Sequence, residues 1–119
     1  MNKRARGTGY EELAANWLRS LGYRIICRNF RNRYGEIDIV AQEREVLVFV
    51  EVKYRRSTTS GTPEEAVTHH KQVQICRVAD WYLCRYQVPD GTSCRFDVVA
   101  VSENGMKLLR NAFPYIPAG

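Results

Sequence analysis

The sequence predicts an α/β fold in which a mixed sheet of four to five strands lies between two layers of helix. Two near-continuous apolar segments, at residues 47–50 and 94–101, are typical of strands that are buried on both faces. A long helix-like segment separates them, and a connection of that kind joins parallel strands. A short polar link after residue 42 instead predicts an antiparallel hairpin. The sheet is therefore mixed, and each of its apolar faces needs a helical layer.

Length and composition are those of one soluble domain. The chain has 119 residues, 45% of them hydrophobic and 26% charged, which suffices for a single core. It lacks both a run of about 18 apolar residues that could cross a membrane and the apolar segment of a signal peptide. The four cysteines form no CxxC pair, so we expect reduced thiols. We expect one cytoplasmic domain over residues 1–119, with a basic tail at about 1–7 and a loose tail at about 114–119.

The first helix is expected over residues 8–21. Thr8 can cap its start, and Gly22 stands where a helix commonly ends. The apolar residues of this segment recur at helical spacing and should face the core; they are Leu13, Ala14, Trp17, Leu18 and Leu21.

Three strands are expected next, over residues 23–30, 35–42 and 45–55. The middle one places apolar residues at every second position, at Ile37, Ile39 and Ala41, as a half-buried strand does. Only a few polar residues separate the last two strands, so these two should form the antiparallel hairpin.

A second helix and one or two further strands complete the predicted fold. Residues 62–65 combine a threonine cap, a proline at the first helical position and a glutamate at the third, and they predict a helix from there to about Tyr86. A turn at residues 89–91 then leads into the second buried strand. Residues 106–113 fit either an edge strand or a short helix.

The net charge of +5 is unevenly distributed along the chain. Residues 1–56 hold 12 Lys and Arg against 7 Asp and Glu, whereas residues 57–119 hold 6 of each. A basic surface of this kind suggests a polyanionic partner, most often nucleic acid. Many basic proteins have no such partner, so charge alone does not decide the function.

The predicted hairpin carries charged residues in segments that otherwise have the apolar composition of buried strands. Glu51 and Lys53 share one face of their strand, because residues two apart point the same way. Glu36 and Asp38 share a face of the other strand for the same reason. If Arg44-Glu45 is a two-residue turn, Asp38 lies opposite Glu51. Glu36 then lies opposite Lys53, and all four side chains fall on one face of the hairpin.

Two chemical interpretations fit this arrangement. Opposed residues have Cβ atoms about 5 Å apart, so Asp38 and Glu51 would repel each other without a cation. Mg²⁺ or Mn²⁺ suits oxygen ligands, and with Lys53 nearby to hold an anion the site could support attack of water on a phosphodiester. The same residues also fit an ion-pair cluster at the exposed end of a hairpin, and spacing alone does not separate the two interpretations.

The hairpin carries a resemblance to a known superfamily. GEIDIVA at 35–41, followed by VFVEVKYRR at 48–56, is similar to the motif of PD-(D/E)XK nucleases. More narrowly, the chain resembles the YraN-like family of small bacterial proteins related to Holliday-junction resolvases. The likeness extends through YEELAANWLRSLGYRIICRNFR, GTPEEAVTHHKQ and RFDVVAV, and so covers nearly the whole chain. It implies a restriction-endonuclease-like fold with a three-layer α/β/α core.

The resemblance also implies a catalytic centre. Asp38 and Glu51 correspond to the metal-binding carboxylates, and Lys53 corresponds to the catalytic lysine. We expect Mg²⁺ or Mn²⁺ as the cofactor, with the backbone carbonyl of Val52 as a further ligand.

Three more residues are assigned less directly. The first-helix glutamate of resolvase-like proteins corresponds to Glu11, although Tyr10 stands where a glycine commonly precedes it. Glu11 could instead close a capping box with Thr8. We interpret Glu36 as the partner of Lys53 rather than as a metal ligand, and Lys71 resembles a charged position near the site of related nucleases.

Nucleic-acid contacts are expected from Lys71 and from four arginines, because the planar arginine fork suits phosphate. The arginines are Arg31, Arg33, Arg55 and Arg56. The alternative for these arginines is a solvated basic edge that discourages strand aggregation. We expect His69 and His70 to be surface residues, since adjacent helical positions diverge by about 100°. Four aromatic residues could stack on bases, but we favour core or rim packing; they are Tyr34, Tyr54, Trp81 and Tyr82.

The sequence thus favours a divalent-metal-dependent endonuclease acting on DNA, with branched DNA as one candidate substrate. A catalytically inactive nucleic-acid-binding module of the same fold is the alternative, and a protein-interaction subunit is a third option. A two-fold enzyme suits a two-fold DNA junction, so the resemblance makes a homodimer one option. No membrane partner is expected.

Overall fold

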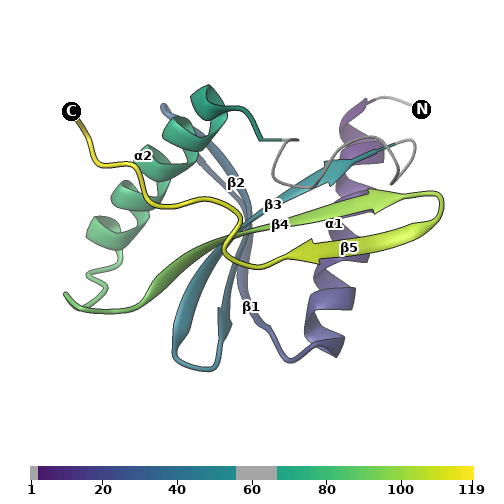
Figure 1. The fold of residues 1–119 in the computed structure, drawn as a ribbon, viewed down its shortest axis with the longest axis horizontal. Coiled ribbons are helices and arrows are strands. Elements are labelled where there is room, and N and C mark those ends of the chain that lie inside the picture. The colour runs from purple at the N-terminus through teal and green to yellow at the C-terminus, as the bar shows by residue number, and fades with distance from the viewer. Residues whose placement is uncertain (1–2, 56–66) are drawn as a thin grey trace.

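The sheet and its two helical layers are present in a computed structural model of the chain, which describes residues 3–55 and 67–119 (Figure 1). The elements, in chain order, are α1 (Lys3–Ser20), β1 (Arg24–Asn32), β2 (Gly35–Glu43), β3 (Val46–Tyr54), α2 (His69–Arg85), β4 (Cys94–Ser102) and β5 (Gly105–Leu109). The strands lie in the order β1-β2-β3-β4-β5. β3 and β4 are parallel, and every other neighbouring pair is antiparallel. The predicted mixed α/β sheet is confirmed, and residues 105–109 form an edge strand rather than a helix.

Each helix covers one face of the sheet and closes its own hydrophobic core (Figure 1). The core under α1 contains Ala14, Ala15 and Leu18 of the helix and, from the sheet, Ile39, Ala41, Val48, Val50, Val99 and Val101. The core under α2 contains Ile75, Cys76, Val78, Ala79 and Tyr82 of the helix and, from the sheet, Ile37, Val40, Leu47, Phe49, Phe96 and Val98. β3 and β4 contribute to both cores, which is why their sequences read as continuous apolar runs. In the described part of the chain, neither helix is long and apolar enough to span a bilayer.

The hairpin of β2 and β3 has the predicted register over most of its length. Arg44 and Glu45 form the turn, and Glu43 pairs with Val46. The pairing continues to Ile39 opposite Val50 and stops there. Asp38 is therefore the first residue of β2 beyond the paired part of the hairpin.

The inside–outside alternation of β1 and β2 breaks next to Asp38. Ile37 and Val40 are three residues apart, yet both pack into the core under α2. Cys27 and Phe30 of β1, also three apart, pack against that same core. Between them Asn29 has φ +55°, a left-handed conformation that asparagine adopts more readily than most residues. A regular strand would put residues three apart on opposite faces, so both strands change face at this point.

The first helix starts earlier than the sequence predicts. α1 begins at Lys3, so Thr8 is an interior residue and not the cap, and most of the expected basic tail is helical. The helix ends at Ser20, and Gly22, with φ +99°, terminates it as expected. There the N–H of Tyr23 donates to Leu18 O at 3.0 Å, as in a Schellman motif. Because Thr8 is inside the helix, the capping-box interpretation of Glu11 is wrong.

The second helix starts later than predicted within the described residues. Its expected cap at residues 62–65 lies outside them. Thr68 has an extended backbone (φ −64°, ψ 160°), and its hydroxyl accepts from Lys71 N at 3.2 Å, so the helix begins at His69. The prediction of a helix that continues without interruption through residue 68 is therefore wrong. The helix ends at Arg85, close to the predicted Tyr86.

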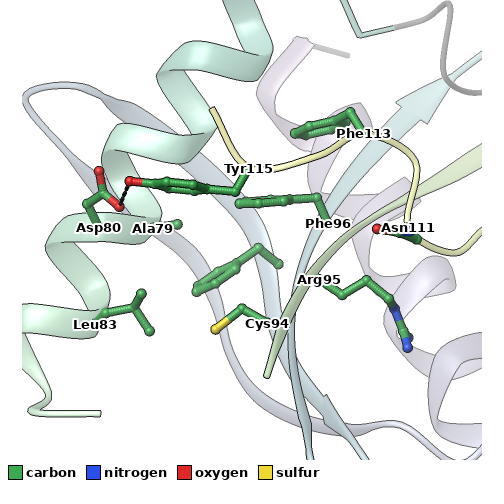
Figure 2. A pocket seen from close by; sticks show the side chains of 10 residues that line it. Ala79, Asp80, Leu83, Cys94, Arg95, Phe96, Asn111, Phe113 and Tyr115 are labelled. Atoms are coloured by element: carbon green, nitrogen blue, oxygen red, sulfur yellow. Dashed lines mark hydrogen bonds between the residues drawn. The ribbon is translucent and has the colours of Figure 1, made fainter. Parts of the chain in front are cut away.

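The C-terminal segment is docked on α2, contrary to the loose tail that we expected. Tyr115 donates its hydroxyl hydrogen to Asp80 at 2.8 Å, and Arg77 donates to the carbonyl of Ile116. Phe113 is buried in the core under α2. Phe113 and Tyr115 line a cavity of about 320 Å³. Figure 2 shows both rings near Phe96, at the start of β4. The C-terminal segment therefore packs against α2 as far as Ile116.

An ionic network centred on the buried Asp97 joins four parts of the chain on the α1 side. Asp97 of β4 is 1% exposed and accepts from Tyr23 Oη at 2.7 Å and from Arg95 Nε at 2.8 Å. Arg95 also donates to Glu43 Oε1 at 2.6 Å, and Arg110 donates to Glu43 Oε2 at 2.8 Å. Each carboxylate in this network has an arginine partner, as buried charges require. Hydrogen bonds from Arg110 and then Arg95 lower the pKa of Glu43 to about 2, against the opposing effect of burial.

We predict that this network stabilises the fold at neutral pH and weakens in acid. The folded pKa of Glu43 is about 2 against an ordinary 4.5, so its contribution is complete above 4.5 and is lost as the pH falls through about 2. Glu43→Gln should lower the free energy of unfolding at neutral pH by about 2 kcal/mol. It should also flatten the dependence on pH in that window, measured by urea unfolding. Glu103→Gln, at an exposed carboxylate, is the control. An equal loss in both variants would contradict the assignment.

Candidate functional site

The candidate site lies where β2 and β3 stop pairing. Asp38 is 9% exposed and Glu51 is 5% exposed, so both carboxylates are largely removed from water. Asp38 Oδ2 accepts a hydrogen bond of 2.7 Å from the backbone N–H of Val52. Continuing the observed register by one step would pair Asp38 with Glu51. A side-chain oxygen of Asp38 thus accepts a hydrogen bond from the Val52 N–H of β3, where the backbone pairing of the two strands has ended.

Helix α1 adds a third carboxylate, and the start of β2 adds a fourth. One carboxylate oxygen each of Glu11, Glu36 and Asp38 lie within 4.8 Å of one another. Glu11 precedes Ala14 and Ala15 by three and four residues, and both alanines are fully buried against the sheet. Side chains at that spacing share one helix face, so Glu11 points toward β2. We call Glu11, Glu36, Asp38 and Glu51 the acidic site.

Two lysines approach the acidic site from the side of α2. Glu51 Oε2 lies 3.8 Å from Lys71 Nζ and 4.0 Å from Lys53 Nζ. Both separations are longer than a hydrogen bond. The buried Oε2 atoms of Glu51 and Glu11 have no hydrogen-bond partner among the residues that the structure describes. The site therefore holds buried acceptor atoms without donors.

The electrostatics of the acidic site disfavour full ionisation. Burial raises the pKa of Asp38 well above its usual range, and the hydrogen bond and charge of Glu51 act in the same direction. The N–H of Val52 opposes this shift. Burial, followed by the charge of Glu36, raises the pKa of Glu11 as well. Like charges this close favour a bound proton or cation, and carboxylate oxygens are the ligands that Mg²⁺ and Mn²⁺ prefer. The residues present fit such an ion.

Most of the predicted site residues come together in the structure. Asp38, Glu51 and Lys53 meet as the hairpin predicts, and Lys71 and Glu11 join them from the two helices. The Val52 group that contacts Asp38 is the N–H, and the role expected for its carbonyl stays a prediction.

The role expected for Glu36 is wrong. Glu36 pairs with Arg31 at 2.8 Å instead of Lys53, and its carboxylate lies beside Glu11 and Asp38. The cause is the break in alternation at Asp38, which turns this end of β2 toward α1. The four charged side chains of the hairpin therefore do not share one face.

The expected phosphate-binding arginines are spread around the site. Arg31 is engaged by Glu36, whereas Arg33 donates to Tyr34 Oη at 2.8 Å in the β1–β2 turn. The N–H of Arg55 donates to Val101 O at 2.7 Å, which extends β3 along β4. Arg56 lies outside the described residues. His69 and His70 are exposed, as predicted.

Sequence reasoning missed Asn29 as a member of this region. Asn29 lies close enough to Glu11 to lower the pKa of that carboxyl, against the larger effect of burial. The signal was available, because asparagine is disfavoured within strands and favoured at positive φ.

Known proteins similar to this chain carry a family label without an activity. A model of the "Uncharacterised protein family UPF0102" matches residues 10–101. A UPF0102 protein of Lachnoclostridium phytofermentans is 50% identical over 113 residues, covering 95% of this chain and 96% of its own length. UPF0102 proteins of Caldicellulosiruptor saccharolyticus and Symbiobacterium thermophilum are 45% and 49% identical. They align with 95% and 90% of this chain, and with 100% and 94% of their own lengths.

We predict that the acidic site is destabilised by its own charges in the absence of divalent ions. Asp38→Asn removes one charge but keeps an oxygen that can accept from Val52, so the free energy of unfolding should rise by about 1 kcal/mol. Asp38→Ala loses the acceptor as well, leaves Val52 N–H unpaired and should be less stable than Asp38→Asn. Urea unfolding in a chelator at neutral pH measures both variants. A stability of Asp38→Asn equal to that of Asp38→Ala would contradict this electrostatic account.

Proposed function

The chain belongs to the uncharacterised protein family UPF0102, and we propose that it is an endonuclease that uses a divalent metal ion to hydrolyse DNA phosphodiesters. UPF0102 is the YraN-like family that the hairpin motif resembles, so that expectation is confirmed, while the family's description assigns no activity. The observation that carries the proposal is the convergence of four carboxylates and two lysines at the end of the β2–β3 pairing. Branched DNA is a candidate substrate.

Asp38 and Glu51 are the proposed metal ligands, with Glu11 completing the site directly or through water. When bound, Mg²⁺ or Mn²⁺ would supply Lewis-acid stabilisation and a more acidic bound water. Glu36 has a carboxylate close enough to assist, and this carboxylate also pairs with Arg31 at 2.8 Å. The Val52 N–H fixes one oxygen of Asp38, so this side chain is oriented before any ligand arrives.

Lys53 and Lys71 are the proposed electrostatic partners of the reacting phosphate. Both ammonium groups lie beside Glu51 at separations longer than a hydrogen bond, and both side chains are about one-third exposed. They can therefore reach a phosphodiester placed over the acidic site. Positive charge there stabilises the negative charge that develops on the phosphoryl oxygens during hydrolysis. Lys53 would also orient the attacking water.

Nucleic acid is the proposed partner because the positive charge of the chain is concentrated in the half that holds the hairpin. The net charge of residues 1–56 accounts for the whole +5. Of the arginines there, Arg33 and Arg55 lie near the ends of strands next to the site, where a phosphate backbone could follow them.

A nucleic-acid-binding module without catalysis is the second candidate. The observation that favours it is that Glu51 already has two ammonium groups within 4.0 Å, so a cation partner is present without a metal. In that case Mg²⁺ should change the affinity for DNA little, whereas added salt should weaken binding steeply through counterion release.

We predict that Asp38→Asn and Lys53→Ala each reduce Mg²⁺-dependent cleavage of branched and single-stranded DNA by at least about 100-fold, since each removes charge complementarity from the reacting phosphate. Lys107→Ala, at an exposed lysine on β5, is the control and should cleave like the parent protein. Circular dichroism and urea unfolding establish that the variants are folded. Cleavage by Asp38→Asn at the parental rate would refute the assignment of the site.

A further inference from the structure

We propose that the face of α2 beside β1 is a stacking surface for single-stranded nucleic acid that leads away from the acidic site. We call this surface the aromatic track; it comprises Phe30, Arg33, Tyr34, Trp81, Arg85 and Tyr86. The inference rests on the proposed function for the class of ligand, and extends it to a substrate with a single-stranded arm.

The aromatic track follows one face of α2. Residues at spacings of three and four share one face of a helix. On α2 these spacings define a stripe that runs from the acidic site toward the C-terminal end of the helix and contains Lys71, Gln74, Val78, Trp81 and Arg85. Lys71, at its beginning, lies 3.8 Å from Glu51 Oε2. The stripe therefore leads from the acidic site to the exposed aromatic residues, and Val78 between them is buried beneath the β1–β2 turn.

The β1–β2 turn rests on this stripe. A Cβ at Gly35 would lie 3.7 Å from Val78 Cγ2 and 3.8 Å from Gln74 Cβ, so the turn is in van der Waals contact with the helix. Tyr34, the residue before Gly35, is 40% exposed. The turn thus brings a further aromatic ring to the surface beside α2, between Lys71 and Trp81 along the helix.

Large rings are exposed along this surface beyond what core packing requires. Trp81 is 41% and Tyr86 is 55% exposed, and both rings pack on Phe30 with centroid distances of 5.7 and 6.2 Å. Of the four aromatic residues for which we favoured core or rim packing, Tyr82 is buried and Tyr54 stacks on Tyr10 at 4.5 Å. Trp81 and Tyr34 remain accessible to a ligand. The rings under Trp81 and Tyr86 hold them in place, so little side-chain freedom would be lost on binding.

Arginines accompany the exposed rings. The Arg33 guanidinium lies 4.9 Å from the centroid of Tyr34, and that of Arg85 lies 5.5 Å from the centroid of Tyr86. Residues 23–34 contain four arginines and no acidic residue, and Asp80 is the one acidic residue of α2. Asp80 is turned to the other side, where it accepts from Tyr115. The charge of the track is therefore complementary to a polyanion.

Aromatic rings interleaved with arginines suit single strands in particular. Unpaired bases offer a π-face to each exposed ring while the backbone phosphates meet the arginines. A duplex keeps its base faces inside the helical stack, so it could use only the arginines. The phosphodiester chain of a strand bound along the track would approach the acidic site at Lys71.

The first test measures binding without cleavage. In EDTA, a fluorescently labelled oligothymidine of about 15 nucleotides should bind roughly five- to tenfold more weakly to Trp81→Leu and to Tyr86→Leu than to the parent protein. Leucine keeps apolar contact with Phe30 but has no π-face. Tyr115→Leu, at a similarly exposed ring outside the track, is the matched control. A blunt hairpin duplex should show no comparable loss. Unchanged single-strand affinity in both track variants, or an equal loss on the duplex, would overturn the proposal.

The second test does not depend on how the track variants fold. The chain has two tryptophans, so in a Trp17→Phe background the fluorescence reports Trp81 alone. Oligothymidine should quench this fluorescence, whereas an abasic strand with the same number of phosphates should not. Equal quenching by both strands would show that bases do not stack there, and would refute the track. Arg85→Gln should weaken binding of both strands more than Arg44→Gln at the far β2–β3 turn; equal effects would count against the track.

These results distinguish the track from the proposed function. If the parent protein cleaves DNA with Mg²⁺ while Trp81→Leu keeps its single-strand affinity, the track is refuted and the nuclease proposal stands. If Trp81 stacks on bases but nothing is cleaved, the track stands and the nuclease proposal fails. If Trp81→Leu instead converts a dimer to a monomer at unchanged strand affinity, this face is an interface between copies of the chain and the track is wrong.

Discussion

The arrangement of the acidic site depends on one hydrogen bond, from the N–H of Val52 to Asp38 Oδ2. In a regular hairpin that N–H would bond to the backbone of β2, and the two strands would remain paired to their ends. Here a side chain takes the place of the backbone, and the last observed pair is Ile39 with Val50. The freed end of β2 can turn toward α1, while β3 continues along β4 and carries Glu51 toward α2. A separation of two strands, rather than a loop, thus creates the space in which both helices contribute side chains.

The network around Asp97 and the acidic site differ in how their carboxylates are paired. On the α1 side, Asp97 and Glu43 are each matched by arginines, and hydrogen bonds hold Glu43 ionised. In the acidic site, four carboxylates meet two lysines that stand at 3.8 and 4.0 Å from Glu51. The pKa of Asp38 is raised there rather than lowered. A matched network stabilises a fold, whereas unmatched buried acceptors are expected at a site that binds something, and this contrast separates the structural cluster from the candidate functional one.

The parts of the fold that follow from hydrophobic periodicity and turn chemistry were predictable from the sequence. The antiparallel β2–β3 hairpin follows from the short polar link between apolar runs, and its register follows once Arg44-Glu45 is taken as the turn. The parallel β3–β4 pair follows from the helix between these strands. The meeting of Asp38 with Glu51 and Lys53 follows from that register. These features are local, or they depend on burial alone.

The features that could not be predicted depend on tertiary contacts. Glu36 pairs with Arg31 instead of Lys53 because both β1 and β2 change face near Asn29, and strict alternation does not anticipate such a break. The capping sequence at Thr8 is locally sound, but the helix extends past it to Lys3. The segment after Phe113 is held by side chains of α2 that no local pattern reveals.

Paramagnetic broadening by Mn²⁺ tests the central claim, that the acidic site binds a divalent cation, most directly. In ¹⁵N-correlated NMR spectra, substoichiometric Mn²⁺ should broaden the amide signals of Val52 and Glu11 first. The amides of Glu43 and Asp97 should stay sharp, because arginines already neutralise those carboxylates. Asp38→Asn should abolish the selective loss at Val52. Broadening centred on Glu43 and Asp97, or the same pattern in Asp38→Asn, would contradict the account.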